Sequence, residues 1–161
     1  MKHIKQRKNE CFITVLAMLS DTDVNKIIAD AQIITPTQHS WSDYLSSSAP
    51  KPDDDAHMVF RALARKYAPY LVDHCGPASV KEVAEKKLYL TCAEFERKTA
   101  RGKGAVIMVS RFLSRPGAHI AAYENGLIYC SDQDGPMTAR EYYKFLATQT
   151  ILCPFAVIPE F

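Results

Sequence analysis

The chain has 161 residues, which predicts a single domain, 1–161, long enough to bury a sizeable core. Its composition is 47% hydrophobic and 24% charged, as in ordinary globular proteins, and its formal net charge is +2. This balance excludes the strong overall field of a dedicated nucleic-acid binder, so we expect no nucleic-acid partner despite the basic first eight residues.

Apolar stretches and cysteine spacing indicate the compartment. No apolar run approaches the roughly 20 residues that span a bilayer, and the N-terminus does not read as a signal peptide. The five cysteines are widely spaced and include no CxxC pair, which argues against a disulfide framework and a structural zinc site. We therefore expect a cytoplasmic protein with no membrane contact, no metal and no other cofactor.

The first predicted element is a buried helix. The run from Phe12 to Leu19 has Thr14 as its one polar member, and a helix that is apolar nearly all round belongs inside a domain. Asn9 is a plausible N-cap for this helix. With that cap, Cys11 lies in the first helical turn.

The rest of the first half also favours helices. Apolar residues recur at helical spacing over 24–31 and 60–67, and a stretch rich in Ser, Pro and Asp over 35–55 predicts a long surface loop. Two pairs have capping-box spacing and predict short helices: Ser79 with Glu82, and Thr91 with Glu94.

The second half favours strands. A β-prone run at 105–110 predicts a buried strand, and the segment 119–132 is two β-prone runs around Asn125-Gly126, a strong hairpin signature. Thr138 with Glu141 has the same capping-box spacing and predicts a last helix, and a closing strand is predicted over 151–161. Helices followed by an antiparallel sheet make an α+β architecture.

The two-residue turn fixes the register of the predicted hairpin. Counting outward from Asn125-Gly126, His119 lies across from Asp132, at a separation that allows imidazole and carboxylate to hydrogen-bond. Such a carboxylate fixes the tautomer of a catalytic histidine, although many opposed pairs of this kind are only surface ion pairs. Asp134 remains a rival partner, since this acidic turn could bend; the register favours Asp132.

Cys11 is the candidate nucleophile. The first turn of a helix lowers a thiol pKa through its unpaired N–H groups and its dipole, and the thiolate is the reactive form. Gln6, five residues upstream, and the Cys11 N–H are candidate donors to an oxyanion. The other cysteines are expected to be small core residues, with Cys130 alternating away from the face of His119. They are Cys75, Cys92, Cys130 and Cys153.

These residues fall in two segments, QRKNECFITVLAMLS (6–20) and AHIAAYENGLIYCSDQDG (118–135). The two resemble papain-like cysteine peptidases, in particular the C39-like group related to bacteriocin-processing peptidase domains. Gln6 and Cys11 match the family's Gln and nucleophilic Cys, and His119 and Asp132 match its His and its Asp or Asn. The resemblance implies a papain-like fold, with the nucleophile starting a buried helix packed on a C-terminal antiparallel sheet.

The resemblance also implies the activity. We expect hydrolysis of a peptide or other amide bond in a protein or peptide substrate through a thioacyl intermediate, with acyl transfer or deamidation as close variants. Phe12 stands where the family usually has Gly, and this departure favours the alternative, a catalytically inactive papain-like domain that binds another protein as an effector or inhibitor. Substrate and oligomeric state are left open.

Overall fold

The computed structural model describes residues 1–6, 10–34, 53–74, 80–112, 114 and 117–160. The fold is α+β, with helices around an open five-stranded antiparallel sheet whose strand order is β4-β3-β2-β1-β5. The helices are α1 (Cys11–Ser20), α2 (Val24–Ile34), α4 (Asp53–Tyr67), the 3-10 helix η1 (Pro69–His74), α5 (Val80–Lys86), α6 (Cys92–Thr99) and α7 (Ala139–Gln149). The strands are β1 (Lys103–Ser110), β2 (Ala118–Glu124), β3 (Leu127–Tyr129), β4 (Met137–Thr138) and β5 (Leu152–Pro159).

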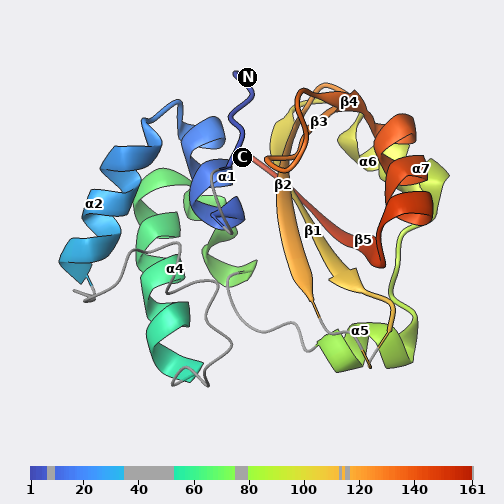
Figure 1. Cartoon of the computed structure of the whole chain (residues 1–161), viewed down its shortest axis with the longest axis horizontal. Helices are drawn as coiled ribbons and strands as arrows, with labels where there is room; N and C mark the ends of the chain where they lie inside the picture. The colour runs from blue at the N-terminus through green and yellow to red at the C-terminus, as the bar shows by residue number, and fades with distance from the viewer. Residues whose placement is uncertain (7–9, 35–52, 75–79, 113, 115–116, 161) are drawn as a thin grey trace.

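The sheet separates two hydrophobic cores. Helices α1, α2 and α4 lie on one side of it and α6 and α7 on the other (Figure 1). Ile120 and Ala122 of β2 face the core on the α1 side, while Ala121 and Tyr123 face the core on the α7 side. This alternation follows from the two-residue period of a strand, and it shows that β2 is covered on both faces.

Helix α1 forms as its apolar run predicts. Ile13 through Leu19 are all buried, and the helix ends at Asp21, whose φ of 51° is left-handed. The N-cap position is occupied by Glu10, so Cys11 is the first helical residue; Asn9, the predicted cap, lies outside the described residues. The predicted placement of Cys11 in the first turn is confirmed.

The other helices agree with the sequence in most places. The loop predicted over 35–55 is wrong at its end, since α4 begins at Asp53; three consecutive acidic residues suit the positive end of a helix dipole. The remainder of that loop, 35–52, lies outside the described residues. Helix α5 begins at Val80, where the sequence predicts a helix, although the predicted cap Ser79 is not among the described residues. The short helix η1 was not predicted.

Two predicted capping boxes are present. Thr91 accepts from the backbone N–H of Glu94 and Thr138 from that of Glu141, and each Glu carboxylate accepts in return from the backbone N–H of its Thr. These boxes fix the first residues of α6 and α7, the two helices that cover the face of the sheet opposite α1.

The hairpin turn and its register are also confirmed. Asn125 and Gly126 have φ of 48° and 85°, and the pairs Glu124↔Leu127, Tyr123↔Ile128 and Ala122↔Tyr129 follow. Strand β3 ends at Tyr129, so the described strand pairing stops at Ala122↔Tyr129 and does not extend to His119. No described helix is both long and apolar enough to cross a membrane.

Candidate functional site

His119 and Asp132 are neighbours, as the hairpin register predicts. His119 sits in β2, paired with Met108 of β1, and Asp132 sits in the turn that follows β3. The His119 Nε2 atom lies 3.6 Å from Asp132 Oδ2. The imidazole is 10% exposed and the carboxylate 47% exposed, so the histidine is nearly buried and the aspartate lies at the surface. Their catalytic roles stay a prediction.

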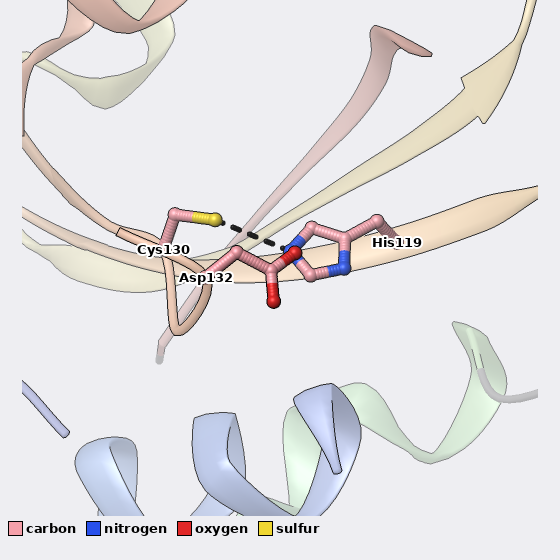
Figure 2. A group of neighbouring side chains, drawn as sticks. All are labelled: His119, Cys130 and Asp132. Carbon is pink, nitrogen blue, oxygen red and sulfur yellow. Dashed lines mark hydrogen bonds and ion pairs between the residues drawn. The ribbon is translucent and has the colours of Figure 1, made fainter. Parts of the chain in front are cut away.

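Cys130 is the unexpected member of this group. Its Sγ atom lies 3.2 Å from His119 Nε2, and Figure 2 shows the sulfur and the ring nitrogen facing one another. The expectation that Cys130 points away from His119 is wrong. Its hairpin partner would be Ala121, and residues two apart on a strand, such as Ala121 and His119, share one face. Cys130 is therefore a diagonal neighbour of His119.

One ring nitrogen faces both partners. The Cys130 sulfur and the Asp132 carboxylate both approach Nε2 of His119. A neutral ring nitrogen carries either one hydrogen or one lone pair, and a Ser-His-Asp relay uses the two ring nitrogens separately. One potential metal-ligand atom from each of the three residues lies within 4.8 Å of the other two.

Gln6 contacts Asp132 directly. Its side-chain amide donates to Asp132 Oδ1, and its backbone N–H donates to the Ser131 carbonyl at 2.9 Å. The Ser131 hydroxyl in turn donates to Gln6 Oε1 at 3.3 Å. These contacts orient the carboxylate with Oδ2 toward His119. One N–H of the Gln6 amide is thus used by Asp132, and the amide nitrogen carries a second N–H.

The rival carboxylate, Asp134, has a different partner. It forms an ion pair with Lys5, which lowers its pKa, and its side chain is 93% exposed. Of the two predicted candidates, Asp132 is therefore the one beside His119.

Cys11 lies at the edge of β2 where β3 has ended. The Cys11 sulfur lies against the backbone of Ile120, the residue after His119, and close enough to Cys130 and Asp132 for their charges to affect it. It approaches from the α1 side of the sheet, whereas the face of His119 is the α7 side. Among the described contacts, His119 has Cys130 and not Cys11 as its sulfur partner.

The pKa of Cys11 is opposite to the expectation. Burial raises it to about 11, although hydrogen bonds from the backbone at Ile120 and Phe12 favour the thiolate and offset part of the effect. Burial lowers the pKa of His119, with Asp132 opposing. The resting site therefore holds a neutral thiol and a neutral imidazole near pH 7, because desolvation outweighs the helix N-terminus.

Tyr142 of α7 is a further component that sequence reasoning missed. Its buried hydroxyl donates to the Met108 sulfur at 3.3 Å and hydrogen-bonds with Cys130. Burial raises the pKa of Tyr142 far above its ordinary value, so the phenol stays protonated. The signal for it was present: residues at helical spacing in 139–149 predict a face of α7 that packs on the sheet.

An open hollow of about 640 Å³ lies beside the site. His119 lines it together with the start of β2 and the connection from α7 to β5, over 117–119 and 148–152. The hollow gives the imidazole a solvent-facing side despite its low exposure.

Phe12 is directed toward another helix. Its ring packs on Phe60 of α4, with centroids 4.6 Å apart. The bulky residue after Cys11 therefore contributes to the contact between α1 and α4, which gives it a packing role.

Comparison with protein families, curated proteins and solved structures finds no match for this chain.

Proposed function

We propose that this chain is a papain-like cysteine hydrolase that cleaves a peptide or other amide bond, with Cys11 as nucleophile. The observation that carries the proposal is the position of the Cys11 sulfur, against the backbone of Ile120, which follows His119 in β2, and near the Asp132 carboxylate. A helix that begins at the cysteine and packs on an antiparallel sheet carrying the histidine supports a papain-like arrangement.

The neutral resting state favours general-base catalysis over a preformed thiolate. His119 takes the thiol proton as the Cys11 sulfur attacks the carbonyl carbon, and the carbonyl electrons move to oxygen. The tetrahedral intermediate collapses, the C–N bond breaks, and the amine leaves with the proton from His119. Water, deprotonated by His119, then cleaves the thioester and frees Cys11.

The supporting residues have distinct tasks. Asp132 stabilises the imidazolium and is itself oriented by Gln6. The Cys11 N–H and the second N–H of Gln6 are the proposed oxyanion donors. An amine in place of water would make the same apparatus an acyltransferase, and a substrate side-chain amide would make it a deamidase.

The substrate is proposed to be a peptide or protein segment. The hollow over 117–119 and 148–152 opens beside His119, where a bound segment would lie next to the imidazole. The hollow is open to solvent, which suits a segment of a larger molecule better than an enclosed small ligand.

A second candidate is a catalytically silent domain that binds another protein. The observation in its favour is that His119 Nε2 faces Cys130 while the Cys11 thiol keeps a pKa of about 11. Hydrolysis requires the imidazole to turn around the strand edge toward Cys11, whereas binding requires no such movement.

An acyl-transfer assay separates the two candidates. The protein is incubated with p-nitrophenyl acetate, release of nitrophenolate is followed, and the acylated residue is located by mass spectrometry. The hydrolase predicts a thioester on Cys11 that turns over, abolished in Cys11→Ala and slowed about 10²-fold or more in His119→Ala. Cys92→Ala, which removes a half-buried thiol on α6, is the matched control and keeps the wild-type rate. Acylation that is absent, or equal at Cys11 and Cys92, would support the silent domain.

A further inference from the structure

We propose that His119, Cys130 and Asp132 form a binding site for a zinc-like divalent cation. The ligand atoms are Nε2 of His119, Sγ of Cys130 and one carboxylate oxygen, Oδ2, of Asp132, which converge at the end of the hairpin (Figure 2). The three protein atoms bind the cation directly and leave its fourth coordination position for water or a substrate atom.

The two separations measured from the ring nitrogen are close to those of tetrahedral coordination. Bond lengths of about 2.0–2.3 Å from zinc to nitrogen, oxygen and sulfur place neighbouring ligands of a tetrahedron about 3.4–3.6 Å apart. The sulfur and the oxygen lie 3.2 and 3.6 Å from the ring nitrogen. A single cation between the three groups would account for the approach of both partners to one nitrogen.

The chemistry of the donors selects the kind of cation. A thiolate, an imidazole and a carboxylate suit zinc and related transition metals, whereas magnesium and calcium prefer oxygen ligands alone. A thiolate and a carboxylate together carry two negative charges, which a divalent cation neutralises. This matters because the Cys130 side chain is only 3% exposed, and a thiolate buried that deeply needs a charged partner.

Contacts around the ligands hold them in place. Gln6 binds Oδ1 of Asp132 and so leaves Oδ2 for the metal. A ring nitrogen of His3 lies 3.0 Å from the Cys130 carbonyl oxygen, and the Gln6 N–H binds the Ser131 carbonyl. Together these contacts tie the N-terminal segment to the turn that carries two of the three ligands, as outer partners commonly do at metal sites.

Metal binding has a consequence for the proposed hydrolase. A cation on Nε2 of His119 removes the lone pair that general-base catalysis requires, so a bound zinc ion inhibits the enzyme. This consequence rests on the proposed function, whereas the binding of the metal does not.

Cobalt(II) is the probe, because its absorption reports thiolate coordination. The wild-type protein, purified under reducing conditions and stripped of metal, is titrated with Co²⁺. We expect one equivalent to bind with a thiolate-to-cobalt charge-transfer band, and Zn²⁺ to displace it. Cys130→Ser should weaken binding more than about 100-fold and remove the band, and Gln6→Ala should weaken it about 10- to 100-fold. Cys92→Ser and Cys11→Ser should retain both band and stoichiometry.

Two results would overturn the site: no stoichiometric Co²⁺ binding by wild type, or an unchanged band in Cys130→Ser. If Cys130→Ser does not fold by circular dichroism, Asp132→Asn in the exposed turn gives the same test through affinity. Acylation by p-nitrophenyl acetate is then repeated with Zn²⁺. Co²⁺ binding without any acylation supports the site and contradicts the hydrolase, whereas acylation without Co²⁺ binding does the reverse.

Discussion

The sulfur of Cys130 lies 3.2 Å from Nε2 of His119, and the two residues come from the two arms of one hairpin. A third group, the Asp132 carboxylate, meets the same nitrogen from the turn beyond. The imidazole is thus positioned by residues local in sequence, while Cys11 comes from the opposite side of the sheet. The role of Cys11 can therefore be tested separately from that of the His119–Cys130–Asp132 group.

The reactivity of Cys11 should follow a raised pKa. With a thiol pKa of about 11, roughly one molecule in 10⁴ is thiolate at pH 7, and the fraction rises about tenfold per pH unit. We expect alkylation by iodoacetamide, resolved for each cysteine by mass spectrometry, to be slow at pH 6–7 and to rise up to about pH 11. Rapid modification of Cys11 at pH 6, dependent on His119, would instead indicate a thiolate–imidazolium pair.

Asp132 and Asp134 make a matched pair for mutation. Asp132→Asn removes the charge beside His119, so we expect acylation by p-nitrophenyl acetate to slow about 10²-fold or more. The acid limb of its pH profile should also move to lower pH, because the Asp132 charge raises the pKa of His119. Asp134→Asn only breaks the exposed pair with Lys5 and should leave the rate unchanged. Equal losses in both variants would contradict this assignment.

Gly104 should resist substitution on steric grounds. A Cβ atom there would lie 2.1 Å from the Ile158 carbonyl oxygen and 2.9 Å from the Tyr123 ring, so β1 and β5 would have to separate. We expect Gly104→Ala to lower the free energy of unfolding by about 3 kcal/mol, measured by urea denaturation. Gly117→Ala is the control, since no atom of the described residues lies within 4 Å of its Cβ position, and its change should stay within about 0.5 kcal/mol.

The capping box of α7 should contribute to stability. Thr138→Ala removes the side chain that accepts from the Glu141 N–H, at a cost of about 1 kcal/mol in thermal or urea unfolding. Thr148→Ala, in the same helix, loses only hydroxyl hydrogen bonds to the Lys144 and Phe145 carbonyls of the preceding turn and should be neutral or slightly stabilising.

The same variant should alter the pH dependence of stability. Thr138 holds the pKa of Glu141 below 4.5, so the folded state gains stability above that pH and loses it as the pH falls through the lowered pKa. Thr138→Ala should flatten this acid dependence, and an unchanged slope between pH 5 and 3 would argue against the contact.

Local patterns predicted much of this fold. The buried helix of Cys11, the two capping boxes and the hairpin register all depend on neighbours in sequence, and all are present. The register even placed Asp132 beside His119, although β3 ends before that pair. Local patterns do not predict how deeply a side chain is buried. The pKa of Cys11 depends on how tightly α1 packs on the edge of β2, and the spacing of residues in the sequence does not predict that packing.

The position of Cys130 was predictable and was nevertheless missed. Strand alternation alone puts Cys130 on the face of His119, because its hairpin partner Ala121 is two residues from His119. Tyr142 is different, because its contact with Cys130 depends on how α7 crosses the sheet. The start of α4 at Asp53 shows a third case, in which a polar composition typical of loops begins a helix.

The hairpin described above also separates two stages of assembly. His119, Cys130 and Asp132 are joined by one tight turn, so bringing them together closes a short loop and costs little chain entropy. Cys11 joins them only when the first helix docks, a contact between distant parts of the chain. A partly folded molecule would therefore gather the three proposed metal ligands before Cys11, the proposed nucleophile, reaches them, and a metal bound at that stage would stabilise the hairpin before the first helix docks.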